Sequence, residues 1–346
     1  MEFLQDFGLF LAKAITIVGA IIIVITAIAG VAMRGQRKGG SAKGDLIVEN
    51  LNETYEDTED LMMSHMLDKK AYKNWAKNQD GDKKQKSKDG KSDSSESEEE
   101  KKRVFVLSFD GDVHAHDNDQ LMETIDAALL VARPGDEFFC ELESPGGLVH
   151  AYGLASSQLR RIRDAGYTLT VGIDKVAASG GYMMACVADK IVAAPFSVIG
   201  SIGVVAQMPN FNRILKKHDV DVELHTAGEY KRTLTLFGEN TDAARAKFKE
   251  ELEETHQLFK QFVTRNRPVV DIDQVATGEH WYGEQALGLN LIDEISTSRD
   301  YLMKEVKTKD VYRLSYEVKV PMIEKLGLAA AKTMSICLGK LGIRGM

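Results

Sequence analysis

The sequence predicts an α/β fold behind an N-terminal transmembrane helix. Between residues 104 and 195, apolar runs of strand length alternate with helical stretches, the pattern of strand–helix–strand units with right-handed crossovers. Residues 14–33 form an uncharged stretch near the N-terminus, and residues 77–102 contain no apolar side chain. These three observations divide the chain into an anchor, a connecting region and a folded domain.

Residues 1–33 are predicted to form a membrane anchor. Residues 14–33 are twenty residues without a charge, which as a helix would span a hydrocarbon core of about 30 Å. The alternative is a cleaved signal peptide, since Ala27-Ile28-Ala29 resembles a cleavage site. However, Glu2 and Asp6 stand where such a peptide carries positive charge, and the apolar stretch is too long. We therefore expect an uncleaved anchor and a single-pass membrane protein.

The region after the anchor is predicted to contain little packed structure. Residues 34–76 form a juxtamembrane segment, with a short strand at 45–49 and a partly amphipathic helix from residue 50. Residues 77–102 cannot bury enough apolar surface to offset the entropy of ordering, so we expect a charged, disordered linker.

The folded domain is predicted over residues 103–300. Its first strand, 104–109, is a nearly continuous apolar run, as in a strand covered on both faces. Further strands are expected at 137–144, 167–173 and 190–195, and helices at 118–132, 148–165, 179–188 and 247–266. Residues 301–346 are moderately apolar but interrupted by lysines, so we expect an interfacial or oligomer-packing segment.

Composition excludes some functions. The net charge of −8 leaves no basic footprint for nucleic acid. The three cysteines, Cys140, Cys186 and Cys337, show no metal-binding spacing. We therefore expect no nucleic-acid partner, no metal ion and no cofactor.

Three short stretches could carry chemistry, and each has a plainer interpretation. ESPGG (143–147) follows a strand and could expose backbone amides, or it could be an ordinary turn. AASGGYMMA (177–185) could present Ser179 as a nucleophile beside the amide of Gly180, or Ser179 could simply cap a helix. AGEYKRT (227–233) contains Lys231, which could act as a base only if it were desolvated.

The order of five motifs favours the catalytic interpretation. SPGG, ASGGY, GSIGV (200–204), GEYK and WYGEQALGLNLID (281–293) together resemble the signal peptide peptidase A (SppA) family, and the whole chain resembles its SohB branch. The resemblance implies a ClpP/crotonase-like superhelix of ββα units. It also implies Ser179 as nucleophile, Lys231 as general base, Ser201 as the partner of the lysine amine, and the amides of Gly147 and Gly180 as oxyanion donors.

The resemblance implies a membrane-anchored serine endopeptidase that cleaves signal-peptide remnants or other membrane-associated peptides and assembles as a closed homo-oligomer. In such assemblies Ser179 and Lys231 can come from different subunits. A non-catalytic membrane scaffold of the same fold is the alternative. A crotonase-type acyl-CoA enzyme is a third possibility, but it gives no account of the serine and lysine together. The residues Tyr182, Met183 and Met184 could line an apolar pocket or pack in the core.

Two arguments disagree about the side of the membrane. Four basic residues follow the anchor closely, at positions 34, 37, 38 and 43, and the positive-inside rule would then place the domain in the cytoplasm. The family resemblance implies the periplasmic side. We expect the periplasmic side because it brings the site to its substrate.

Overall fold

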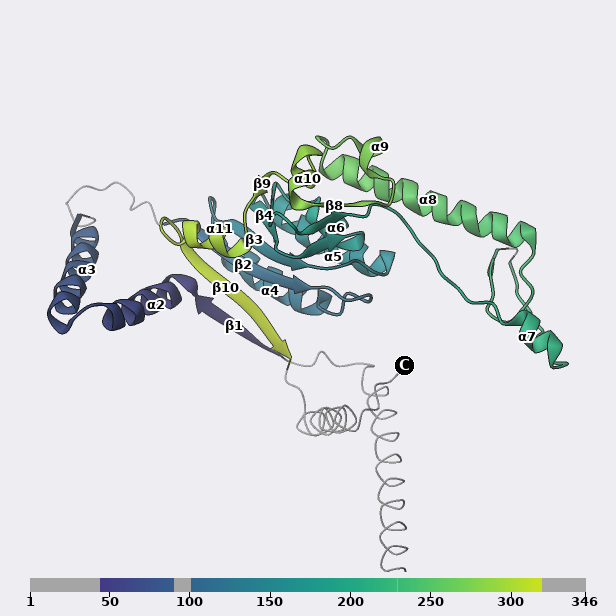
Figure 1. Ribbon diagram of the computed structural model, residues 1–346, viewed down its shortest axis with the longest axis horizontal. Helices are drawn as coiled ribbons and strands as arrows, with labels where there is room; N and C mark the ends of the chain where they lie inside the picture. Colours follow the sequence, from purple (N-terminus) through teal and green to yellow (C-terminus); the bar gives the residue numbers. More distant parts are fainter. Residues whose placement is uncertain (1–43, 90–100, 229, 319–346) are drawn as a thin grey trace, which may run out of the picture. The chain divides into compact units, whose positions relative to one another are not determined.

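The computed structural model describes residues 44–89, 101–228 and 230–318, which belong almost entirely to one compact unit, Leu46–Tyr316 (Figure 1). The predicted anchor, residues 90–100 of the predicted linker and residues 319–346 lie outside the described residues. No helix within the described ranges is long and apolar enough to cross a membrane.

The unit is built on two sheets. The larger has seven strands in the order β1-β10-β2-β3-β4-β6-β9, and the smaller has the order β5-β7-β8. The strands are β1 (Gly44–Asn50), β2 (Arg103–Asp110), β3 (Glu137–Glu143), β4 (Thr168–Ile173), β5 (Val176–Ala178), β6 (Lys190–Ala193), β7 (Val198–Gly200), β8 (His280–Tyr282), β9 (Glu294–Ile295) and β10 (Asp310–Val318).

The pairings from β10 through β2, β3, β4 and β6 to β9 are all parallel. In the smaller sheet β5 pairs parallel with β7, and β7 pairs antiparallel with β8. The α/β prediction is confirmed, whereas the ClpP/crotonase-like superhelix stays a prediction.

Helices connect the strands. They are α2 (Leu51–Met66), α3 (Lys69–Asp89), α4 (Asn118–Val131), α5 (Val149–Asp164), α6 (Gly180–Ala185), α7 (Asn212–Lys217), α8 (Asp242–Asn266), α9 (Ile272–Val275), α10 (Gly283–Gly288) and α11 (Ser298–Glu305). The helices expected between residues 118 and 266 are all present, with ends that differ by a few residues and a shorter helix after Ser179.

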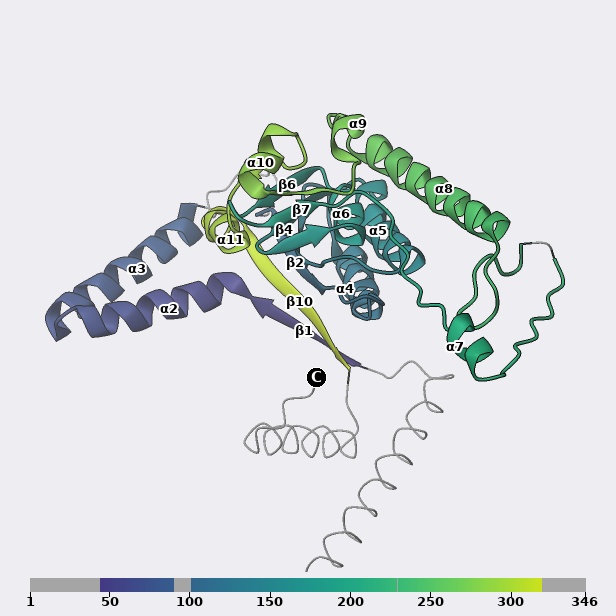
Figure 2. The ribbon, with the colours of Figure 1, turned by 45° about the vertical axis from the view of Figure 1, so that its right-hand side comes forward.

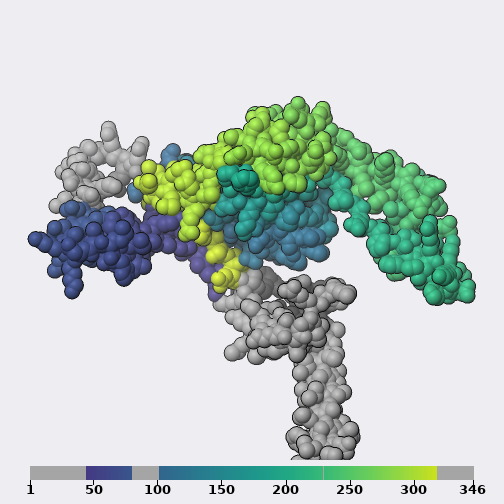
Figure 3. All heavy atoms as spheres, in the orientation of Figure 1, coloured from purple at the N-terminus to yellow at the C-terminus, as the bar shows by residue number. Residues whose placement is uncertain are grey.

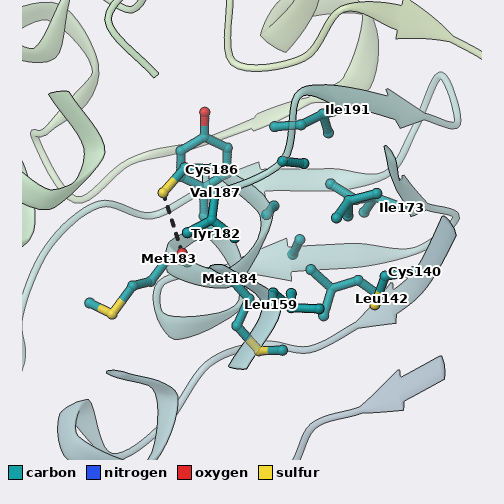
Figure 4. Packing of buried hydrophobic residues seen from close by; sticks show 14 of the residues in the cluster. Cys140, Leu142, Leu159, Ile173, Tyr182, Met183, Met184, Cys186, Val187 and Ile191 are labelled. Carbon is teal, nitrogen blue, oxygen red and sulfur yellow. Dashed lines mark hydrogen bonds between the residues drawn. The ribbon is translucent and has the colours of Figure 1, made fainter. Parts of the chain in front are cut away.

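The large sheet is buried on both faces, which explains its apolar strands. In β2, Phe105, Leu107 and Phe109 belong to the larger core cluster together with residues of α4 and α5. Val104 and Val106 point to the other face and pack with Leu51 and Leu302, from α2 and α11. Figure 4 shows part of the larger cluster, including the buried thiols of Cys140 and Cys186.

Two boundaries differ from the prediction. Of the described residues of the predicted linker, 77–89 are the second half of α3, which extends the helical segment beyond residue 76, and 101–102 lead into β2. The predicted C-terminal segment begins inside α11 and then supplies β10, which pairs with β2 inside the large sheet. A strand inserted between two others is recognisable only from pairing, because residues 310–318 alternate polar and apolar side chains like an edge strand.

Candidate active site

Ser179 lies at the sharp turn from β5 into α6. Its backbone has φ 52° and ψ −117°, a conformation that a non-glycine residue adopts only under local constraint. Its N–H donates to the carbonyl of Gly200 (2.7 Å), and its carbonyl accepts the N–H of Met183 (3.0 Å). The side chain is half-exposed. The turn is therefore held from both sides while the hydroxyl remains accessible.

The residues after Ser179 must be small because other backbone and ring atoms crowd them. A Cβ at Gly180 would overlap the Tyr152 ring, and one at Gly181 would lie 2.5 Å from the carbonyl of Ser144. The sequence ASGG is thus required by packing around the turn as well as by any chemistry.

The SPGG loop lies directly against this turn. Ser144 bridges to Ala177, with hydrogen bonds from Ser144 N to Val176 O (2.8 Å) and from Ala178 N to Ser144 O (3.0 Å). Gly146 has φ 88°, and a Cβ there would lie 2.7 Å from the amide nitrogen of Gly180. The motifs that resemble an oxyanion hole are therefore adjacent.

The amides of Gly147 and Gly180 are available to a ligand. Neither N–H donates to any acceptor within the described residues. Gly147 is exposed, whereas Gly180 is buried, and buried backbone amides are nearly always paired. Both residues border one cavity of about 240 Å³, together with Ser179. The arrangement can hold a negatively charged oxygen beside the Ser179 hydroxyl.

A buried network that the sequence did not indicate supports this loop. The hydroxyls of Ser144 and Tyr152 lie 2.5 Å apart, and Ser144 Oγ accepts the N–H of Gly146 (3.1 Å). Tyr152 Oη donates to the carbonyl of Asp112 (2.7 Å), and burial raises the pKa of Tyr152. Ser144 stands in the ESPGG motif, but nothing in the sequence pairs it with Tyr152 on the following helix.

Ser201 occupies the position equivalent to Ser179 on the neighbouring strand. Ala178 pairs with Gly200 in the parallel register of β5 and β7, so both serines directly follow paired residues. Ser201 also has φ 52°, and its N–H donates to Glu279 O (2.7 Å). The predicted assisting serine is therefore a near neighbour of the predicted nucleophile.

Lys231 is not brought to this site within one chain. It lies in the α7 segment, which we define as residues 206–240, and its side chain is exposed. Lys231 does not border the cavity of Ser179. In the described part of the chain, it makes no hydrogen bond to Ser179 or Ser201. Its backbone N–H donates to Gly228 O (3.2 Å).

The α7 segment makes its hydrogen bonds mainly with itself. Asn210 Nδ2 donates to Thr235 O (2.8 Å), and Asn212 Nδ2 donates to Phe237 O (2.9 Å). In Figures 1 and 2, α7 lies beyond the N-terminal end of α8, away from the sheets. The space-filling view shows the same green atoms standing clear of the teal atoms around the sheets (Figure 3).

The cavity beside Ser179 is mostly apolar. Helix α8 contributes much of its wall, which motif matching did not predict. Besides Ser179, Gly147 and Gly180, it is lined by Val149, Gly153, Met183, Gly203, Val204, Val205, Thr255, Leu258, Phe259 and Phe262. Of the three residues expected at a pocket or in the core, Met183 lines the cavity, whereas Tyr182 and Met184 are buried among core side chains (Figure 4).

Comparison with known proteins places this geometry in a family context. A sequence profile of peptidase family S49 matches residues 161–312, and one of the N-terminal region of family S49 matches residues 2–159. The chain is 48% identical to a probable protease SohB of Haemophilus influenzae, over 96% of this chain and 94% of that protein. It is 47% identical to a probable protease SohB of Buchnera aphidicola, over 88% of this chain and 99% of that protein.

More distant similarities are also present. Protease 4 of Haemophilus influenzae is 27% identical over 47% of this chain and 27% of that protein. Among solved structures, a mutant of the 1510-N membrane-bound stomatin-specific protease has a TM-score of 0.40 at 14% identity, covering 60% of this chain and 85% of that chain. A second mutant of it, in complex with a substrate peptide, has a TM-score of 0.39 at 15% identity, covering 65% and 96%.

Proposed function

The chain belongs to peptidase family S49, and from this premise we propose that it is a serine endopeptidase with Ser179 as nucleophile and Lys231 as general base. The observation that carries the proposal is the environment of Ser179. A half-exposed hydroxyl in a constrained turn and two backbone amides without acceptors among the described residues border one cavity. If Ser179 served only to cap α6, the fold would have no need to bring the amide of Gly147 from the SPGG loop to the same cavity.

The proposed reaction follows from these positions. Ser179 Oγ attacks the carbonyl carbon of a peptide bond, and its proton passes to the neutral amine of Lys231. The amides of Gly147 and Gly180 donate to the oxygen that becomes negatively charged. When the tetrahedral intermediate collapses, the leaving amine takes the proton back from Lys231. Water then attacks the carbonyl carbon of the acyl-enzyme and gives a proton to Lys231, which returns it to Ser179 Oγ as the acid product leaves. Ser201 is proposed to orient the lysine amine in both steps.

Lys231 is proposed to reach the nucleophile of a second copy in a closed homo-oligomer. The α7 segment exposes many large apolar side chains. Exposed apolar residues that are scattered singly over a surface are ordinary, but a group of them in one segment indicates an interaction site. Within the described part of this segment they are Met208, Phe211, Ile214, Val220, Val222, Leu224, Tyr230, Leu236 and Phe237. A second copy covering them would also remove water from Lys231, and desolvation favours the neutral amine that a base requires.

The substrates are proposed to be membrane-associated peptides with apolar side chains, such as signal-peptide remnants. The support is the apolar cavity beside Ser179, in which Met183, Leu258 and Phe262 would contact the substrate side chain. We further propose that residues 1–33 anchor the chain in the bacterial inner membrane with the catalytic domain in the periplasm. Alkaline phosphatase fused after Met346 should then be active, whereas activity of a cytoplasmic reporter at the same position would reverse the orientation.

The test is peptide cleavage by the purified full-length chain in mild detergent. Ser179→Ala and Lys231→Ala should each lower kcat/KM by at least about 10³-fold, whereas Lys217→Ala, an exposed lysine of the same segment, should leave it unchanged. A fluorophosphonate probe should label wild type but not Ser179→Ala. Full cleavage by either active-site variant would refute the assignment, and an unlabelled, inactive wild type would favour the non-catalytic scaffold.

A further inference from the structure

We propose that Asp112, His114 and His116, in the loop between β2 and α4, form a binding site for a divalent transition-metal ion of the zinc type. One donor atom from each of the three side chains lies within 4.8 Å of the other two, and all three residues are exposed. No other such group of histidine, cysteine or carboxylate donors occurs among the side chains that the structure describes, in residues 44–79, 101–228 and 230–317. Two imidazoles and a carboxylate are a donor set suited to zinc.

The loop is already folded into the required shape. Asp112 Oδ1 accepts the backbone N–H groups of His114 (3.0 Å) and His116 (3.1 Å). Ala115, between the two histidines, has φ 53°, and its N–H donates to Asp112 O (3.1 Å). The imidazole rings stack with centroids 5.3 Å apart. Little conformational entropy would therefore be lost when an ion binds.

The carboxylate also has a second role available. Asp112 Oδ2 lies 2.5 Å from His116 Nδ1. A carboxylate that holds one nitrogen of a ligating imidazole orients the ring and raises its basicity. Asp112 can thus either bind the ion directly or hold His116 for it. Because the site is exposed, water would complete the coordination.

The proposed site adjoins the loop that carries Gly147 but lies outside the cavity. Val113 O, between the donors, accepts the N–H of Leu148 (2.9 Å), and Asp112 O accepts the hydroxyl of Tyr152 (2.7 Å). None of Asp112, His114 and His116 borders the cavity of Ser179. We assign the ion no step in peptide hydrolysis. Its effect is to fix the loop on which the Gly147 segment rests.

The test is calorimetric titration of ZnCl₂ into the untagged full-length chain in detergent. One ion per chain should bind, and His114→Ala and His116→Ala should each weaken binding at least about tenfold. His225→Ala is the matched control, because His225 is an exposed histidine beside a carboxylate (Glu223, 3.3 Å) without a second histidine. It should bind as wild type does.

Circular dichroism establishes that each variant is folded. Asp112→Asn, which keeps an oxygen for the loop amides, should also weaken binding without loss of folding. Isotherms for His114→Ala and His116→Ala that match wild type would overturn the proposal, as would an equal loss in His225→Ala. These outcomes are independent of peptidase activity.

Discussion

The surroundings of Ser179 and those of Lys231 are opposite in character. The backbone of Ser179 is hydrogen-bonded to Gly200 of β7 and Met183 of α6, and the preceding strand β5 is hydrogen-bonded to Ser144 of the SPGG loop. Ser144 and Tyr152, which support that loop, are fully buried. Lys231 lies in the α7 segment, where no large apolar side chain is buried among the described residues. The proposed nucleophile and oxyanion donors are thus organised by one chain, while the proposed base lies on a surface that a single chain leaves uncovered.

This difference separates two kinds of variant. Changes around Ser179 should damage catalysis in a chain that still assembles. Charges placed among the exposed apolar side chains of the α7 segment should damage assembly and, through it, catalysis. Removing an ion pair should lower the free energy of unfolding strongly in the packed region and weakly in the α7 segment.

Outside the proposed catalytic pair, the largest effect is expected from Gly147→Ala. A Cβ at this position would overlap the backbone carbonyl of Val113, which cannot move without disturbing its bond to Leu148. The amide of residue 147 would shift, and losing one oxyanion donor lowers kcat about 10²- to 10³-fold. Steady-state peptide cleavage measures the change.

Gly153→Ala is the matched control on the wall of the same cavity. A Cβ there meets no atom within 4 Å, so kcat should stay near the wild-type value. If both variants lost activity equally, or if Gly147→Ala remained fully active, the assignment of Gly147 as an oxyanion donor would be wrong.

An intermediate effect is expected from Ile214→Glu. Ile214 is 57% exposed on α7, and a charge there would have to be buried or displaced if a second copy covers the segment. Light scattering in detergent should show smaller assemblies, and activity should fall at least about tenfold because burying an unpaired charge costs several kcal/mol.

Leu130→Glu provides the comparison for Ile214→Glu. Leu130 is 86% exposed near the end of α4, outside the α7 segment, so the same change should alter neither assembly nor activity. An Ile214→Glu protein with wild-type size and activity would show that this face is not an interface.

Changes at ion pairs concern stability, not catalysis, and should separate the two regions; the smallest effect of all is expected in the α7 segment. Asp136 is 5% exposed, pairs with Arg103, and accepts the N–H groups of Arg103 and Arg133. Asp136→Asn should lower the free energy of unfolding by about 3 kcal/mol. Lys216→Ala removes an exposed pair with Glu239 in the α7 segment and should cost less than about 1 kcal/mol. Urea unfolding followed by circular dichroism measures both.

The Asp136 pair also predicts a pH dependence. Burial opposes ionisation of Asp136, but the hydrogen bonds and charge of Arg103 and the amide of Arg133 outweigh it and lower the pKa of the carboxyl. A lowered pKa stabilises the fold fully above the unfolded-state value of 3.8, and this contribution is lost as pH falls through the folded pKa. Asp136→Asn should therefore lose part of the wild-type decline in stability below that pH. An unchanged decline would contradict this account of the pair.

Local patterns were sufficient to predict much of the fold. The apolar runs that became β2, β3 and β4 were recognisable because strands buried on both faces lack alternation. The strand β10 was missed because its place inside the sheet depends on pairing with β2, a partner some two hundred residues earlier in the chain. The helix was predicted to end at residue 76, before the end of α3, because residues 77–89 lack the apolar periodicity on which helix prediction depends.

The site was predictable where it is built from short motifs. ASGG and SPGG meet because β3 and β5 end side by side, and Ser201 joins them through the register of β5 and β7. The support from Ser144 and Tyr152 could not be predicted, since it depends on how α5 packs against the SPGG loop that precedes it. The wall contributed by α8 could not be predicted because it depends on packing between segments far apart in the chain. The meeting of Ser179 and Lys231 stays a prediction.

Ser179 of one copy is proposed to work with Lys231 of another, and complementation between two inactive variants tests this pairing. Ser179→Ala and Lys231→Ala chains, each inactive alone, are dissociated, mixed in equal amounts and reassembled. A mixture of wild type with Ser179→Ala, labelled for energy transfer, verifies subunit exchange. If each site joins two copies in a closed ring, about a quarter of the sites in the mixture carry both groups and activity returns to about a quarter of wild type. A mixture that exchanges subunits but stays inactive would show that both residues must come from one chain.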